Sequence, residues 1–275
     1  MVKALVTGGC SFSECESEWI DTWPRHLANR LDVSHYSLGK GSVGNGYISR
    51  AVIYQTNELL KTYNANDILV AIMWTSWDRI DLRLPVLDDI PHRDAETEYN
   101  IRKGSDWPNY PIKWKDLSTD VQQEIETIFP NLKLLLLNPL HNVRRGFLDN
   151  SYWTNISMLL DIEKYRNLYF SLFEDNVSKQ IYSYEHILRT QWFLQKHNVK
   201  SIMMKMSDSV TDFKVVKETE HLQDMIDWSV FLNCSGMIEW TMKKYGESGF
   251  PKFPDLHPGT EQHRAFTEEV ICKAF

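Results

Sequence analysis

The chain has 275 residues, of which 43% are hydrophobic and 24% are charged, and its formal net charge is −7. These values are typical of a globular protein and exclude the disordered class, and no apolar run approaches the roughly 18 residues that a membrane span needs. The negative charge disfavours nonspecific binding of nucleic acid, which depends on Lys and Arg neutralising phosphates. We therefore expect neither a nucleic-acid nor a membrane partner.

The amino-terminal segment predicts no secretion signal. The apolar stretch of residues 2–7 is short and leads into Gly8 and Gly9 without a small-residue cleavage site. The cysteines show neither Cys-x-x-Cys spacing nor the histidine pairing typical of zinc sites; they are Cys10, Cys15, Cys234 and Cys272. We expect reduced thiols, no metal and no organic cofactor, and a cytoplasmic location, or a virion location if the chain is viral.

Short apolar runs alternate with amphipathic segments over the first 75 residues. Residues 2–7 predict a buried strand, 19–31 a helix, 34–38 a second strand, 48–63 a helix, and 68–74 a strand covered on both faces. Strands and helices in this order are typical of right-handed βαβ units, which build a parallel sheet.

Regular periodicity weakens between residues 82 and 150. We interpret this stretch as an irregular insertion at the functional edge of the sheet, within a single domain of residues 1–275. Its one apolar piece, residues 132–137, fits either a strand or a helix. Helical periodicity returns over 156–197, with a break near 175–176, before a strand at 201–206 and helices at 235–245 and 259–274.

Tryptophan is frequent, with ten residues in the chain. Three of them, Trp107, Trp114 and Trp153, fall in predicted loops, where exposed aromatic rings can bind a sugar or a partner. The alternative is that these rings pack the irregular insertion.

Ser11 directly follows the first predicted strand. Open α/β sheets place their ligand sites at the carboxyl ends of parallel strands. Gly8 and Gly9 allow a sharp turn, and a helix that starts after such a loop directs backbone N–H groups at a developing oxyanion. Ser11 is therefore a candidate nucleophile; the alternative is that Ser11 or Ser13 caps a turn or a helix.

A glycine-rich loop at residues 39–46 follows the second predicted strand, so it is expected at the same edge as Ser11. The loop does not end in the Gly-Lys-Ser/Thr of a P-loop, and it does not make a dinucleotide fingerprint. The backbone N–H of Gly41 and the side-chain amide of Asn45 are candidate oxyanion donors. A flexible turn between strand and helix is the alternative.

Polar groups also follow the third predicted strand, in residues 74–79. Thr75 or Ser76 can donate a hydrogen bond to a ligand, and Trp74 and Arg79 are candidate substrate-binding residues. Arg79 can hold an anionic substrate, or it can form a structural ion pair with Asp78 or Asp81, which we favour.

His257 lies between Asp255 and Pro258, on a loop that leads into the last predicted helix. A carboxylate beside a histidine can hold the tautomer that a general base needs and can stabilise the imidazolium. Ser11, His257 and Asp255 thus supply the three groups of a serine hydrolase, although an exposed loop histidine without a catalytic role is the alternative.

These residues, in this order, resemble the SGNH, or GDSL-type, hydrolase superfamily of esterases and acyl hydrolases. Gly9-Cys10-Ser11 is similar to the first sequence block, Gly41 to the glycine of the second, residues 74–79 to the third, and Asp255-Leu256-His257 to the fifth. The likeness covers about the first 80 and the last 25 residues. The Gly-Cys-Ser-Phe start looks similar to divergent members met in bacteria and phages.

The resemblance implies a three-layer α/β/α, flavodoxin-like fold with a parallel sheet. It also implies an ester hydrolase with Ser11 as nucleophile, His257 as base and Asp255 as the orienting acid. The backbone N–H groups of Ser11 and Gly41 would bind the oxyanion. The third block lacks the usual asparagine, so we assign its part to Asn45 or, as the second choice, Ser76.

Two further departures from the superfamily are that Cys10 replaces an aspartate and that the Asp–His spacing is one residue short. We favour an O-acetylated carbohydrate as the ester substrate. An alternative from another class is a non-catalytic binding or structural protein on the same scaffold, such as a virion or glycan-binding component. Thiol chemistry at Cys10 or Cys15 is a third reading.

Overall fold

The computed structural model describes residues 2–15, 20–41, 43–77, 79, 81–83, 119, 123, 144–145, 152–155, 176–211, 216–252 and 255–274. The chain divides into two compact units. The larger consists of Met1–Ile80 and Asp175–Phe275, and the smaller of Asp81–Glu174, which includes the predicted insertion. The predicted helix segment 156–175 and the apolar piece 132–137 lie outside the described residues.

Four strands of the larger unit form a parallel sheet in the order β2-β1-β3-β7. They are β1 (Ala4–Gly8), β2 (Ser34–Ser37), β3 (Ile68–Trp74) and β7 (Lys200–Lys205). Ala4 of β1 lies opposite both Ser34 and Ile68, and Leu69 of β3 lies opposite Lys200. Every residue of β1 and β3 is buried, as their continuous apolar sequences predict for strands covered on both faces. The predicted α/β class with a parallel sheet is confirmed.

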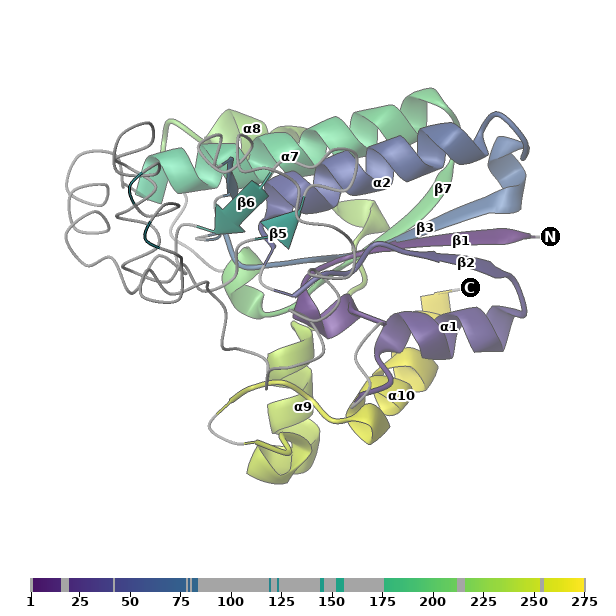
Figure 1. The fold of residues 1–275 in the computed structure, drawn as a ribbon, viewed down its shortest axis with the longest axis vertical. Helices are drawn as coiled ribbons and strands as arrows, with labels where there is room; N and C mark the ends of the chain where they lie inside the picture. Colours follow the sequence, from purple (N-terminus) through teal and green to yellow (C-terminus); the bar gives the residue numbers. More distant parts are fainter. Residues whose placement is uncertain are drawn as a thin grey trace. The chain divides into compact units, whose positions relative to one another are not determined.

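Helices lie on both faces of this sheet (Figure 1). The helices α2 (Asn45–Leu59) and α7 (Asn176–Lys196) pack together over one face, and α1 (Trp23–Leu31) and α10 (Thr260–Glu269) pack together over the other. The unit also contains α8 (Glu220–Met225) and α9 (Met237–Tyr245). Short 3₁₀ turns occur at Ser11–Ser13 (η1), Ala65–Asp67 (η2), Asp208–Val210 (η6), Trp228–Val230 (η7), Gly246–Gly249 (η8) and Ile271–Ala274 (η9).

The helix ends differ from the sequence-based expectations by a few residues. The helix predicted from residue 19 begins at Trp23 and carries Pro24 in its first turn, where a proline removes no helical hydrogen bond. The helix predicted from residue 48 already begins at Asn45. The last predicted helix, 259–274, is divided into α10 and the turn η9.

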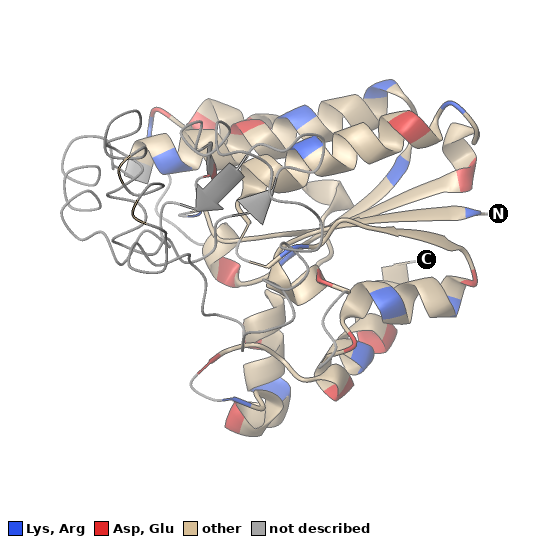
Figure 2. Cartoon of the chain, viewed as in Figure 1, with Lys and Arg blue, Asp and Glu red and all other residues tan. Residues whose placement is uncertain are grey.

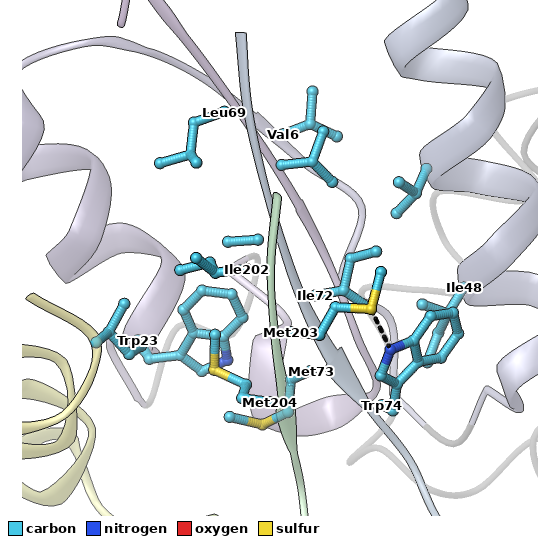
Figure 3. Packing of buried hydrophobic residues seen from close by; sticks show 14 of the residues in the cluster. Val6, Trp23, Ile48, Leu69, Ile72, Met73, Trp74, Ile202, Met203 and Met204 are labelled. Atoms are coloured by element: carbon cyan, nitrogen blue, oxygen red, sulfur yellow. Dashed lines mark hydrogen bonds between the residues drawn. The ribbon is translucent and has the colours of Figure 1, made fainter. Parts of the chain in front are cut away.

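The core is built from side chains that alternate between the two faces of the sheet (Figure 3). On the side of α2, Trp74 packs beside Ile48, and its indole Nε1 donates a hydrogen bond to the sulfur of Met203 at 3.3 Å. On the opposite side, Trp23 of α1 packs beside Met204. All these side chains are 0–1% exposed, so both faces of the sheet are covered around its central strands.

Charged residues lie mainly on helices and connecting segments, and the strands β1 and β3 carry none (Figure 2). This distribution follows from the cost of burying an unpaired charge in a two-sided core. No helix in the described part of the chain is long and apolar enough to cross a membrane.

The smaller unit contains an antiparallel three-stranded sheet in the order β4-β6-β5. Its strands are β4 (Asp81–Arg83), β5 (Arg144–Arg145) and β6 (Tyr152–Asn155). Trp153 therefore lies in a strand, so the prediction of a loop position for this tryptophan is wrong. Trp107 and Trp114 lie outside the described residues.

Two buried histidines make the stability of the larger unit depend on pH. Burial is the main cause that lowers the pKa of His186 in α7 and of His263 in α10 from 6.5 to about 3. Neighbouring charges act in the same direction: the guanidinium groups of Arg189 and Arg50 at His186, and the protonated forms of His26 and His257 at His263. Both imidazoles are consequently neutral in the folded protein throughout the neutral and mildly acidic range.

We expect the free energy of unfolding to fall as the pH decreases from 7 to 5. Below pH 6.5 the unfolded chain protonates both histidines while the folded chain does not, so each costs about 2 kcal/mol of stability at pH 5. Urea unfolding at the two pH values measures the loss. His263→Gln should remove the share that belongs to His263, about 2 kcal/mol at pH 5, whereas the exposed control His221→Gln should leave the pH dependence unchanged. Equal pH dependence in both variants would contradict the assignment.

Candidate active site

A tight turn at the carboxyl end of β1 positions Ser11. A Cβ atom on Gly9 would lie 2.1 Å from the hydroxyl oxygen of Ser13 and 3.1 Å from the carbonyl oxygen of Met73, so only glycine permits this close approach. The N–H of Ser13 donates to the carbonyl of Cys10 at 2.8 Å and closes the turn η1. As a result Ser11 is half-buried at the edge of the sheet and accessible from outside.

Cys10, next to Ser11, is a core residue. Its side chain is fully buried, and its sulfur lies 3.4 Å from the sulfur of Met206. The Asp-to-Cys difference from the SGNH pattern therefore places a small apolar group in the core. A fully buried thiol has no access to a substrate, so the structure does not favour thiol chemistry at this position.

Ser11, His257 and Asp255 form one hydrogen-bonded chain. The Ser11 Oγ lies 2.7 Å from His257 Nε2, within the roughly 3.5 Å expected for a nucleophile and its base. The His257 Nδ1 lies 2.5 Å from Asp255 Oδ1. Since a carboxylate can only accept, Nδ1 carries the proton and Nε2 accepts the proton of the Ser11 hydroxyl. This is the hydrogen-bonding pattern by which a serine hydrolase activates its nucleophilic hydroxyl.

The loop that carries His257 is anchored on both sides. Pro258 and Gly259 are buried, and the Gly259 N–H donates to the carbonyl of Gly249 at 3.3 Å. On the other side the ring of Phe12 packs against the imidazole of His257, with the ring centroids 5.0 Å apart. These contacts fix the ring opposite Ser11, although the two residues are 246 positions apart in the chain.

The spacing of Asp255 and His257, one residue short of the SGNH pattern, still permits their hydrogen bond. The Asp255 N–H donates to the carbonyl of Lys252 at 2.8 Å, which turns the loop back before the histidine. The two side chains remain open to solvent, with exposed fractions of 54% for Asp255 and 42% for His257. The acid of this site is thus much more hydrated than the buried aspartate of the chymotrypsin-type triad.

The structure corrects our expectation for Asn45. Its side chain is 1% exposed, and Nδ2 donates both to the carbonyl of Thr75 at 3.2 Å and to the hydroxyl of Ser183 at 2.8 Å. Its Oδ1 accepts the N–H of Thr75 at 3.0 Å. Because both amide hydrogens are used, Asn45 ties α2 to the end of β3 and to α7, and it presents no hydrogen to an oxyanion.

Gly41 lies beside Ser11, as an oxyanion donor should. A Cβ atom on Gly41 would lie 3.9 Å from the Cβ atom of Ser11. However, the Gly41 N–H donates to the carboxylate Oε2 of Glu14 at 3.0 Å. This donor therefore already holds an anionic oxygen.

Trp74, the last residue of β3, does not lie where we expected it. It is fully buried and bonded to Met203, so it is a core residue, and its assignment to substrate binding is wrong. Ser76 is half-buried, and its backbone carbonyl accepts the Arg79 N–H at 3.3 Å. The Nη1 atom of Arg79 is buried without a hydrogen-bond partner, while Asp78 lies outside the described residues. Anion binding at Arg79 stays a prediction.

Sequence reasoning missed three residues at this site: Phe12, Glu14 and Ser183. Phe12 and Glu14 belong to the same short segment as Ser11, and this proximity was the available signal. Ser183 comes from α7, and nothing in the sequence connects it with Asn45.

The part of the chain that the structure describes contains no group of three or more His, Cys, Asp or Glu residues arranged to hold a metal ion. Neither a scan against protein-family models nor a search of the curated proteins finds a match to this chain.

Proposed function

We propose that this chain is a serine esterase or acyl hydrolase that works through an acyl-enzyme on Ser11. The observation that carries the proposal is the hydrogen-bonded chain from Ser11 through His257 to Asp255. An SGNH-type, flavodoxin-like version of the α/β fold belongs to the same proposal. It is supported by the position of Ser11 after β1 of a parallel sheet that has helices on both faces.

In the proposed mechanism, His257 Nε2 accepts the proton of Ser11 as the Oγ atom attacks the ester carbonyl. Asp255 holds the Nδ1–H and stabilises the imidazolium. His257 then gives the proton to the leaving alkoxide, and an acyl group remains on Ser11. A water molecule, deprotonated by His257, attacks the acyl-enzyme and releases the acid. The backbone N–H groups of Ser11 and Gly41 are the proposed oxyanion donors.

The proposed substrate is a small-molecule or carbohydrate ester, with an O-acetylated sugar as our first choice. The exposure of Asp255 and His257 supports it, because a reaction centre open to solvent accepts an acetyl group carried on a bulky polar alcohol. A deep apolar channel would favour a long acyl chain.

A non-catalytic binding protein on the same scaffold is the second candidate. The observation in its favour is that two of the predicted oxyanion donors already have acceptors: Asn45 is bonded to Thr75 and Ser183, and Gly41 is bonded to Glu14. A binding protein has no need of a free oxyanion donor.

Labelling with a fluorophosphonate distinguishes the two candidates. An activated serine attacks the phosphorus and becomes covalently modified, whereas the serines of a binding protein do not. We expect a single adduct, which peptide mass spectrometry should locate at Ser11, and no adduct after heat denaturation. Labelling of another residue, or none, would contradict the esterase proposal and favour the binding protein.

A further inference from the structure

Glu14 is held next to the proposed nucleophile by its backbone. It follows the turn η1 directly, and its N–H donates to the carbonyl of Ser11 at 3.4 Å. Its own carbonyl accepts the hydroxyl of Thr22 at 3.3 Å. The backbone of Glu14, from which its side chain extends, is therefore fixed close to Ser11.

The loop that carries Gly41 lies directly on this turn. The Lys40 N–H donates to the carbonyl of Gly9 at 3.2 Å. A Cβ atom on Gly39 would lie 1.9 Å from the carbonyl oxygen of Ser13, so the two backbones touch at a position that only glycine can occupy. The contact between Glu14 and Gly41 thus joins two anchored segments.

The glycine at position 41 makes room for the carboxylate. A Cβ atom there would lie 2.9 Å from Glu14 Oε2 and 3.9 Å from the Ser11 Cβ. The Glu14 carboxylate and the Ser11 side chain therefore border the same small space in front of Gly41. The Gly41 N–H, which we propose as a donor to the oxyanion, thus already donates to the carboxylate oxygen of Glu14.

We propose that Glu14 is a specificity-determining residue on the oxyanion side of Ser11, an inference that rests on the esterase function proposed above. The Gly41 N–H has one hydrogen, so the ester carbonyl must displace the carboxylate in order to use it. The carboxylate also repels a second negative charge nearby. Glu14 therefore slows the hydrolysis of neutral esters and excludes acyl groups that carry a carboxylate.

The test compares wild type and Glu14→Gln on two substrates, neutral p-nitrophenyl acetate and anionic p-nitrophenyl monosuccinate. An amide oxygen is a weaker acceptor than a carboxylate and carries no charge. We expect Glu14→Gln to raise kcat/KM about threefold to tenfold for the acetate. The increase in kcat/KM for the succinate should be at least about ten times larger than the increase for the acetate. Glu14→Ala, which removes the acceptor, should likewise raise kcat/KM more for the succinate than for the acetate. The control Glu58→Gln, at the far end of α2, should change neither value.

The amide signal of Gly41 in a ¹⁵N-correlated NMR spectrum provides a readout independent of turnover. Loss of the charged acceptor should shift the Gly41 amide proton and speed its exchange with solvent in Glu14→Gln and leave it unchanged in Glu58→Gln. Two results would overturn the proposed role of Glu14 and leave the esterase proposal intact. One is an unchanged Gly41 signal in Glu14→Gln; the other is an active wild type and an active Glu14→Gln that have the same ratio of kcat/KM for the succinate to kcat/KM for the acetate. If neither protein hydrolyses either ester, the proposed esterase function is wrong, and so is the role of Glu14 in turnover.

Discussion

Replacing Ser11 by alanine should reduce kcat/KM for p-nitrophenyl acetate by at least about 10³-fold, because it removes the atom that forms the acyl-enzyme. The loss should appear without unfolding. Ser11 is half-buried, and its hydroxyl bonds to the solvent-exposed His257, so no core contact disappears. Initial rates measure the effect, and thermal unfolding tests that the variant is folded.

The matched control is Ser34→Ala, which changes an exposed serine at the start of β2, away from the carboxyl edge of the sheet. This variant should keep the wild-type rate. Ser11→Ala should also abolish fluorophosphonate labelling, and Ser34→Ala should not. A folded Ser11→Ala protein that retains more than about a tenth of the activity would show that another residue forms the acyl-enzyme.

The sequence predicts the sheet well because its central strands are apolar without interruption. Residues 68–74 must be covered on both faces, and such a strand in alternation with helices occurs almost only in parallel α/β sheets. The position of Ser11 follows from the same pattern, since the residue after a parallel strand lies at the carboxyl edge. The strand order therefore brings Ser11 and the loop of Gly41 to one place without any knowledge of tertiary contacts.

The orientation of individual side chains at this edge could not be predicted in the same way. Trp74 is the last residue of β3, and its indole turns into the core, where it packs beside Ile48 and donates a hydrogen bond to the sulfur of Met203 on the neighbouring strand. Asn45 is a suitable oxyanion donor by residue type, yet Ser183, which is 138 positions away, takes one of its hydrogens. Contacts of this kind depend on packing between elements that no local pattern connects.

Replacing His257 by alanine should lower kcat/KM about as much as replacing Ser11, by at least about 10³-fold. Without the imidazole, the hydroxyl of Ser11 has no group to accept its proton. The side chain of His257 is 42% exposed, so its removal leaves a hollow that solvent and small solutes can enter. Added imidazole should occupy this hollow and restore turnover at least about tenfold in His257→Ala. It should restore none in Ser11→Ala, which retains the base and lacks the nucleophile.

The double variant sharpens this prediction, because residues that act as one unit have effects that do not add. Ser11→Ala/His257→Ala should be about as slow as either single variant, and imidazole should not rescue it. His221→Ala, which removes an exposed histidine of α8, should keep the wild-type rate. If the losses from Ser11→Ala and His257→Ala multiply instead, the two residues act independently, and the hydrogen bond between them is not the one used in catalysis.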